Sequence, residues 1–411
     1  MFKFIEKPFI VAMLFYTTGA LLPIVTARLS RYSGLGPNAV EFAIQGALYG
    51  IAFCFIAMRW KAVLRGAMNA KWILALVMVA IVSASWSQDP LITLRRSAVL
   101  FATTLFGIYL ATRFDVPNQL RLFAWTYVLV ICASFFCASF LPQYGIDHSI
   151  HLGDWQGAFY QKNMLARAMA IATLVFMSVR FKSYSAIRWI GIAGSLTLLF
   201  LSRSITGAVV LAIILSTWPI YRLFRTKFSF GIPIFIGVAT ALCASAAYAY
   251  QSMPTLLELM NRNEGLTGRI DLWQAVWLSI SRKPWLGYGF DAFWQNMRGE
   301  SVNVLLAVGW TPAYAHNGFL DVILGLGFLG LAVFAIGYAI LWRRAFTFAR
   351  QYPGPAGLWP CMFLAFMLFY NLTEGPVISQ NNITWVLYVA VAVSLAIHLP
   401  AKHVTGDAVV R

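Results

Sequence analysis

Two arginines in the second half of the chain have the type and setting of residues that bind an anion. Arg269 lies in the first turn of a predicted helix, where a cation opposes the helix dipole at a cost of about 0.3–1 kcal/mol. That position becomes favourable when an anion is bound, because the guanidinium and the free N–H groups of the helix start converge on it. Arg203 occupies the tight turn SRSIT between two apolar runs. The alternative for each is an ordinary surface side chain, which for Arg203 would contact lipid headgroups.

His316 begins the next apolar run and has Asn317 beside it. An imidazole at this depth can act as a general base near neutral pH, and the alternative is a hydrogen-bonded helix cap. Asp321 lies five residues further on, which is a poor spacing for a direct bond to the ring.

A third basic group falls at the start of another apolar run, GAFYQKNMLARAMA. Arg167 lies about one turn after Asn163, and an arginine inside a membrane span usually faces the bundle or a wet cavity. Arg167 is therefore a functional candidate, whereas Lys162 can also be explained as an interfacial anchor.

No metal site is predicted. His148 and His151 lack a third ligand, so a solvated loop is the preferred interpretation. The carboxylates expected outside the cytoplasm are scattered, namely Glu258, Glu264, Asp271, Asp291 and Glu300. The chain contains no Asp-x-Asp pair, P-loop, GxGxxG unit or HExxH, so a cytoplasmic nucleotide-sugar mechanism has no visible basis.

The composition predicts an all-α, polytopic membrane helix bundle that forms a single domain over residues 1–411. Of the 411 residues, 60% are hydrophobic and 11% charged, and the mean hydropathy is +0.72. A soluble chain of this length needs more charge to cover its surface. The five cysteines all lie inside apolar runs, so they are interpreted as buried hydrophobes rather than a disulfide framework.

The apolar runs predict twelve transmembrane helices. The N-terminal run lacks a convincing cleavage site and is interpreted as the first span. The predicted spans are 9–27, 38–58, 71–84, 97–112, 119–141, 163–179, 187–201, 205–223, 229–250, 315–342, 358–371 and 381–399.

Basic residues in alternate short loops predict the orientation. Of the 31 Lys and Arg residues, 19 fall on the side that carries both termini, which is therefore predicted to be cytoplasmic. This bias explains the net charge of +17 without nucleic acid. The segment 251–314 then lies outside the cytoplasm, as one long loop between spans nine and ten.

The long loop 251–314 is predicted to contain an amphipathic helix at the membrane interface. Ile270, Trp273, Val276, Trp277 and Ile280 recur at helical spacing. Pro284 ends the pattern, and Gly287 and Gly289 predict a turn. Such a helix either roofs the bundle over a site or lies passively at the interface.

Several segments together resemble the O-antigen ligase/polymerase superfamily. The defining region is matched by TGRIDLWQAVWLSISRKPWLGYGFDAFW followed by AHNGFLDVILGLGFLGL. Supporting matches are GAFYQKNMLARAMA, LSRSITGAVV and WSQDPLITLRRSAVLFATTLFGIYLATRF. The last segment is especially similar to exopolysaccharide polymerases of the ExoQ type. The resemblance covers most of the chain, and it distinguishes polymerase from ligase poorly.

The resemblance implies a metal-independent, inverting glycosyl transfer on the periplasmic side of a bacterial inner membrane, without a cofactor. The donor would be an undecaprenyl-diphosphate-linked glycan, and the acceptor a sugar hydroxyl on a glycan or on lipid A–core. By the matched motifs, Arg203 and Arg269 should hold the diphosphate and His316 should take the acceptor proton. Substrate binding is expected of Lys162, Asn163, Arg167 and Asn317. Membrane lipids and other polysaccharide export proteins are the expected partners.

Three functions remain open from the sequence. The first is a polysaccharide polymerase, and the second is a ligase that transfers O-antigen to lipid A–core. The third is a transporter of an anionic solute with Arg167 and Arg203 along its path, although no internal repeat is visible and the polar groups gather on one side.

Overall fold

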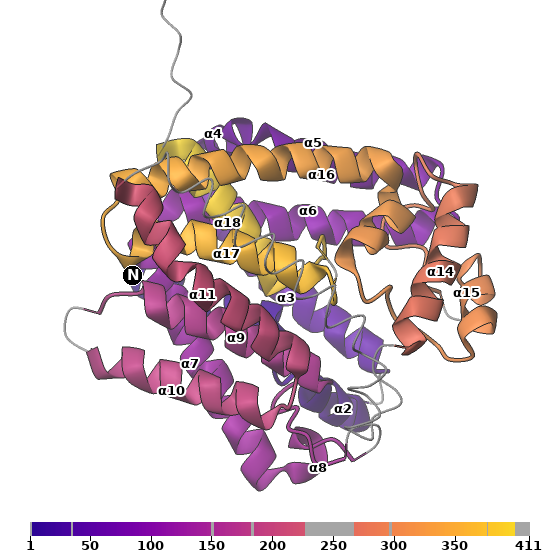
Figure 1. The fold of residues 1–411 in the computed structure, drawn as a ribbon, viewed down its shortest axis with the longest axis horizontal. Coiled ribbons are helices and arrows are strands. Elements are labelled where there is room, and N and C mark those ends of the chain that lie inside the picture. Colours follow the sequence, from indigo (N-terminus) through magenta and orange to yellow (C-terminus); the bar gives the residue numbers. More distant parts are fainter. Residues whose placement is uncertain are drawn as a thin grey trace, which may run out of the picture.

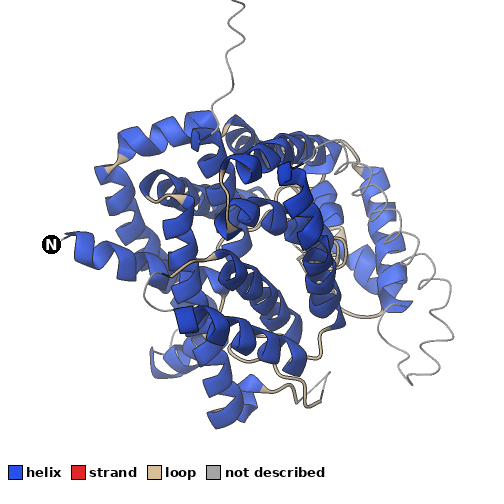
Figure 2. Ribbon diagram, turned by 60° about the vertical axis from the view of Figure 1, so that its left-hand side comes forward, coloured by secondary structure: helices blue, strands red, loops and turns tan. Residues whose placement is uncertain are grey.

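A computed structural model describes residues 2–33, 36–148, 152–181, 185–226, 267–295, 298–375 and 377–398. Apart from one antiparallel bridge between Ile146 and Trp155, the regular structure of these residues is helical (Figure 2), which confirms the all-α class. The helices of the first half are α1 (Phe2–Thr18), α2 (Leu22–Ser33), α3 (Pro37–Met58), α4 (Trp60–Asn69), α5 (Lys71–Val82), the 3₁₀ turn η1 (Ser83–Ser85), α6 (Pro90–Arg113), α7 (Val116–Phe140) and α8 (Pro142–Gly145). Those of the second half are α9 (Lys162–Ser178), α10 (Ser185–Leu201), α11 (Ile205–Thr226), α14 (Thr267–Arg282), α15 (Ser301–Val308), α16 (Gly318–Gln351), α17 (Pro355–Asn371) and α18 (Ile383–His398).

The long helices form one bundle with α17 and α18 at its centre. In Figure 1, α16 lies across the top of the view, α17 and α18 lie beneath it, and α9, α10 and α11 occupy the lower half. Nearly every side chain of α18 is buried, including Val386, Leu387 and Val389 at 0% exposure. A helix that is apolar all round belongs in the interior, so the sequence of α18 explains its central place.

The described helices make this a multi-pass membrane protein. Four helices (α3, α6, α7 and α16) are long and apolar enough to cross a membrane, and two bent pairs raise the number to six. Shorter apolar helices are α10, α11, α17 and α18. The predicted ninth span, 229–250, lies outside the described residues.

One predicted span is a bent pair of helices, and another is one half of such a pair. The first, 9–27, is broken between α1 and α2, which meet at 88°. Gly19 (φ +79°) and Leu21 (φ +61°) take left-handed conformations there, and the freed N–H of Leu21 donates to the carbonyl of Ala158 at 2.8 Å. The third, 71–84, corresponds to the short helix α5, which meets α4 at 93°. Helix α4 had not been predicted.

The predicted tenth span, 315–342, is broken at Gly327. This glycine has φ +67° and ψ −171°, and a Cβ there would lie 2.1 Å from the carbonyl oxygen of Trp285. The segment 284–289 docks into the break. Phe328 N donates to Pro284 O at 2.8 Å, and Tyr288 N donates to Leu324 O at 2.7 Å. The backbone groups released by the break are thereby satisfied.

The predicted amphipathic helix is confirmed as α14, although one residue of its predicted apolar face is exposed. Leu272, Val276 and Ile280 are buried, whereas Trp277 is 49% exposed. The buried residues form a small second core with α15 and the start of α16. The predicted turn is also confirmed, because Gly287 and Gly289 both have positive φ. In Figure 1, α14 and α15 lie together at the right-hand end of the bundle.

Close packing of α6 against α18 yields a test of the fold. A Cβ at Gly107 of α6 would lie 2.8 Å from Val389 Cβ, whereas a Cβ at Gly46 of α3 would meet nothing within 4 Å. Gly107→Ala should cost about 1–3 kcal/mol of stability through overpacking. Gly46→Ala should be neutral or stabilising by up to about 1 kcal/mol, because alanine favours the helix. Thermal unfolding of the purified proteins in detergent measures both, and equal midpoints for Gly107→Ala and the unchanged protein would contradict this packing.

Candidate functional site

The carboxylate of Glu374 lies at the centre of the site, in the turn between α17 and α18. Its side chain is only 2% exposed. Oε1 accepts hydrogen bonds from Arg269 Nη2 at 2.8 Å and Asn163 Nδ2 at 2.9 Å. Oε2 accepts from Tyr314 OH at 3.1 Å and pairs with His316 Nδ1 at 3.3 Å. One carboxylate thus joins groups from α9, the start of α14 and the segment before α16.

These partners keep the buried carboxylate charged. Burial alone raises the pKa of Glu374, because desolvation disfavours the ionised form. The hydrogen bond from His316, the charge of Arg269 and the Tyr314 hydroxyl outweigh it, so the pKa of Glu374 falls below its ordinary value of 4.5. The same negative charge and burial raise the pKa of the Tyr314 hydroxyl. Tyr314 therefore stays a neutral donor.

Arg269 and His316, two of the residues singled out from the sequence, are brought together by Glu374. Arg269 lies in the first turn of α14 as predicted and also donates from Nη1 to the Thr373 carbonyl at 2.8 Å. Because a carboxylate can only accept, Nδ1 of His316 must carry a proton, and in the neutral imidazole Nε2 is then the nitrogen with the lone pair. Within the described residues Nε2 has no hydrogen-bond partner. This tautomer is the one that a general base needs.

The backbone around His316 is held from both sides. His316 has φ +50°, a left-handed conformation that costs a non-glycine residue about 1–3 kcal/mol. Ala315 N donates to Asp321 Oδ1 at 3.0 Å, and Ala315 O accepts from Trp273 Nε1 at 2.9 Å. Asp321 therefore positions the backbone before His316 instead of bonding the ring. The Tyr314 ring packs on the imidazole with centroids 4.3 Å apart.

Asn317 forms the N-cap of α16. Its Oδ1 accepts from Phe319 N and Leu320 N, and its Nδ2 donates to Leu372 O at 3.2 Å. These bonds fix the end of the helix next to His316. The expected role of Asn317 in substrate binding stays a prediction.

A second group of charges surrounds Asp154, whose side chain is 8% exposed. It pairs with Lys162 at 2.7 Å and with Arg203 at 3.4 Å. Arg203 is 64% exposed, and its φ of +48° turns the short connection between α10 and α11. One nitrogen of its guanidinium thus contacts Asp154, and most of the side chain is open to solvent.

Asn163 connects the two groups of charges. Ser204, next to Arg203, donates to Asn163 Oδ1 at 2.8 Å, while Asn163 Nδ2 donates to Glu374. The carbonyl of Asn163 accepts from Tyr370 OH at 3.0 Å. Arg203 therefore lies one residue and two hydrogen bonds from the Glu374 carboxylate.

Arg167 supplies a further positive charge, on α9. It has no hydrogen bond or ion pair with any of the described residues, yet its charge acts on the hydroxyls of Tyr314 and Tyr370. Across the two groups four cations face two carboxylates, which leaves two positive charges with His316 neutral. The cations are Lys162, Arg167, Arg203 and Arg269, and the carboxylates are Asp154 and Glu374.

Three residues of the site, Glu374, Tyr314 and Asp154, are not predicted from the sequence. Glu374 follows an apolar run in NLTEGP, and its place in a loop on the same predicted side as Arg269 was the available signal. The described carboxylates among those predicted to lie outside the cytoplasm make no hydrogen bond or ion pair with Glu374 or Asp154. Asp291 pairs with Arg96, Glu300 pairs with Arg282, Asp271 is exposed, and Glu258 and Glu264 fall outside the described residues.

No metal-ligand cluster is present in the part of the chain that the structure describes. No group there brings together three or more His, Cys, Asp or Glu side chains around a common point. His148 contacts the carbonyl of Pro142 at 3.3 Å, and His151 lies outside the described residues. That the reaction needs no metal stays a prediction.

Comparison with known proteins confirms the family resemblance. Residues 190–335, which include Arg203, Arg269 and His316, match the family model described as O-antigen ligase. The chain is 22% identical over 306 residues to the exopolysaccharide production protein ExoQ of Rhizobium meliloti, covering 69% of this chain and 67% of that protein. It is 27% identical over 305 residues to an O-antigen ligase of Pseudomonas aeruginosa, covering 71% and 68% respectively.

The buried charge of Glu374 gives a pH test. Because its folded pKa is lowered, the stability it contributes is fully present above pH 4.5 and is lost as the pH falls through the folded value. Glu374→Gln should cost on the order of 3 kcal/mol near pH 7, since it leaves Arg269 without its counter-charge. The difference in melting temperature from the unchanged protein should shrink as the pH falls below 4.5.

Glu300→Gln is the matched control for this titration, because it removes a carboxylate from the more exposed pair with Arg282. Exposed pairs contribute about 0–1 kcal/mol, so its effect should be smaller at every pH. A Glu374→Gln difference that stays constant from pH 7 to 3 would show that the carboxylate is not held ionised.

Proposed function

We propose that this chain, a membrane protein of the O-antigen ligase family, transfers a glycan from a lipid diphosphate to a sugar hydroxyl. The observation that carries the proposal is that the buried carboxylate of Glu374 contacts both Arg269 and His316. A diphosphate-binding cation and a correctly protonated base are then neighbours. Glycosyl transfer from a lipid diphosphate needs both groups at the same carbon centre.

The reaction that fits these residues is an inverting displacement. The acceptor hydroxyl gives its proton to Nε2 of His316, and its oxygen attacks the anomeric carbon of the donor sugar. The bond from that carbon to the diphosphate oxygen breaks, and the electron pair leaves with the diphosphate. Glu374 stabilises the imidazolium that forms and keeps Nδ1 protonated, which is the role of the acid in Ser-His-Asp triads.

The positive charges of the cluster can stabilise the leaving group. Two net positive charges in the cluster suit a diphosphate, whose negative charge grows as the bond to carbon breaks. Arg167, without a partner among the described residues, and Arg203, mostly exposed, have donors left for phosphate oxygens. Lys162, through Asp154, and Asn163, through Ser204, keep Arg203 near the start of α9, the helix that also carries Arg167.

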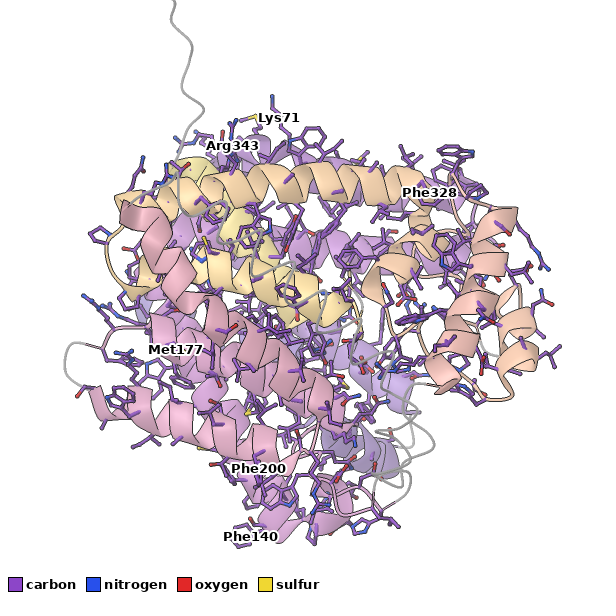
Figure 3. All side chains as sticks on the ribbon, in the orientation of Figure 1. Lys71, Phe140, Met177, Phe200, Phe328 and Arg343 are labelled. Atoms are coloured by element: carbon purple, nitrogen blue, oxygen red, sulfur yellow. The ribbon has the colours of Figure 1, made fainter. Side chains whose placement is uncertain are left out.

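The orientation belongs to the same proposal. Twelve spans with both termini in the cytoplasm would put the Glu374 cluster at the periplasmic face, where a lipid-linked donor presents its glycan. In Figure 3, Arg343, from a predicted cytoplasmic loop, lies toward one end of α16, and Phe328 lies toward the other end, beside α14. This separation of the basic loop from the α14 region supports the orientation.

The leading activity is the polymerase, supported by the similarity to ExoQ and by the segment 86–114. The second candidate is the ligase, supported by the similarity to the Pseudomonas aeruginosa protein. A deletion strain separates them. A ligase deletion loses capped lipopolysaccharide while polymer accumulates on its lipid carrier, whereas a polymerase deletion leaves single repeat units there. An anionic-solute transporter has no support from the comparisons.

The roles of Arg269 and His316 can be tested with lipid-linked oligosaccharide and purified full-length protein. His316→Ala should lower the transfer rate about 10²–10⁴-fold through loss of the base. Arg269→Ala should lower it by a similar factor through loss of charge stabilisation. Arg282→Ala, on the same helix but in the exposed pair with Glu300, is the matched control and should retain near-normal transfer. Full-length product from both His316→Ala and Arg269→Ala would end the proposal.

A further inference from the structure

A cavity of about 150 Å³ lies next to the Glu374 cluster and plays no part in the mechanism above. It is lined by residues of the segment 290–294, by Ala313 and Tyr314, by the first turns of α16 and by Ile378. At roughly 10–15 Å³ per water, a space of this size holds about 10–15 waters, comparable to the twelve non-hydrogen atoms of one hexose. Its position beside a site for glycan chemistry raises the question of what it binds.

Two carboxylates face the cavity with oxygen lone pairs to spare. Asp291 Oδ2 accepts from Gln380 Nε2 at 3.0 Å and pairs with Arg96 at 3.3 Å, while Oδ1 has no partner among the described residues. Asp321 Oδ1 accepts from Trp294 Nε1 at 2.8 Å. Its Oδ2 has only a long contact of 3.3 Å with Ala315 N. Both side chains are held in place and can each accept a further hydrogen bond from a hydroxyl.

The remaining wall is largely apolar and aromatic. Phe290, Phe293, Trp294 and Tyr314 line it, together with Val322 and Leu326. A mostly apolar cavity with a few fixed polar groups is the usual form of a small-molecule site. A sugar ring matches this pattern, since it has C–H faces for the rings and hydroxyls for the carboxylates.

The charges narrow the class of ligand. Arg96 offsets the charge of Asp291, so Asp321 leaves the cavity with one uncompensated negative charge. This charge disfavours phosphate and uronic acids, so the diphosphate of the donor belongs with the cations around Asp154 and Glu374. A metal ion fits poorly, because Arg96 already pairs with Asp291 and the described residues offer no set of three metal ligands. An uncharged polyol satisfies both carboxylates without meeting a like charge.

Tyr314 places the cavity next to the proposed base. Its ring lines the cavity and also packs on His316 at 4.3 Å, while its hydroxyl donates to Glu374. A ring in the cavity is therefore separated from the imidazole by the thickness of one side chain, which is where a neighbouring sugar of the same glycan would extend.

We propose that this cavity binds one uncharged sugar ring of a glycan substrate, whose hydroxyls donate to Asp291 and Asp321 against the aromatic wall. The inference rests on the proposed function for the identity of the glycan. It adds a subsite and a preference for neutral sugars over uronic acids. The ring comes from either the donor or the acceptor, and the two sources differ in the kinetic constant that the cavity controls.

Two variants alter the cavity without touching Arg269, His316 or Glu374. A Cβ at Gly325 would make ordinary contacts of 3.5 Å with Gly289 O and 3.6 Å with Asp291 N, so Gly325→Ala narrows the space at little cost to the fold. Asp291→Asn keeps the shape and removes one charge. The matched controls are Gly46→Ala, in open space on α3, and Asp271→Asn, exposed on α14.

Binding is measured first, without any transfer reaction, by saturation-transfer NMR of the purified full-length protein. N-acetylglucosamine and glucose should give a signal that Gly325→Ala and Asp291→Asn weaken and the controls retain. Glucuronic acid should bind at least tenfold more weakly than glucose. No signal from either neutral sugar, or equal signals from all proteins, would overturn the subsite. This readout stands even if the protein proves to catalyse no glycosyl transfer.

Steady-state kinetics then show whether the bound sugar ring belongs to the donor or to the acceptor. Gly325→Ala should raise the KM of either the donor or the acceptor by about tenfold or more. One added methyl group in a tight pocket changes substrate selectivity by a factor of this size. A rise in the KM of the acceptor alone identifies the ring as the acceptor sugar, and a rise in that of the donor alone identifies the donor sugar. Unchanged values of both in a protein that does transfer glycans would overturn the inference while leaving the proposed function intact.

Discussion

The structure of the site depends on the solvation of one buried carboxylate. Removing an ionised carboxyl group from water costs several kcal/mol unless charged and polar donors replace the solvent. Glu374 obtains its donors from Arg269, Asn163, Tyr314 and His316, which lie between 58 and 211 residues away from it in the sequence. The start of α14, the start of α9 and the segment before α16 must therefore meet at the turn between α17 and α18. The constraint that satisfies Glu374 also assembles a cation and a base.

The second requirement is that the backbone near the site be rigid enough to keep that geometry. The break at Gly327 lets the segment 284–289 dock into α16, and this docking fixes α14 on the bundle. Trp273 and Asp321 then hold both polar atoms of the Ala315 backbone. His316 is kept in a left-handed conformation that it would leave if it were unsupported. Contacts from α14 and α16 thus maintain the strained backbone at His316.

Local sequence patterns predicted the elements of the site well and its contacts poorly. Arg269 was placed correctly because the apolar spacing of α14, Pro284 and the glycine pair define that helix in a single stretch of chain. The breaks at Gly19 and Gly327 escaped notice because both lie inside continuous apolar runs, where a bent helix and a straight one have the same composition. Glu374 was missed for a different reason. A lone acid in a short loop has no periodicity, and its role exists only through partners that the fold supplies from elsewhere. The grouping of Arg203 with Asn163 likewise depends on how α9 and α11 pack, which no local pattern encodes.

The central claim is that Glu374 and Arg269 form one interacting buried pair, and a double-mutant cycle tests it most directly. The free energies of unfolding of the unchanged protein, Arg269→Gln, Glu374→Gln and the double variant at pH 7 give the interaction energy of the two side chains. A buried pair in direct contact should show coupling of about 0.5–3 kcal/mol, so that the double variant is less destabilised than the sum of the single ones. Losses that add to within about 0.3–0.5 kcal/mol would mean that the two side chains act independently, and the account of the site would be wrong.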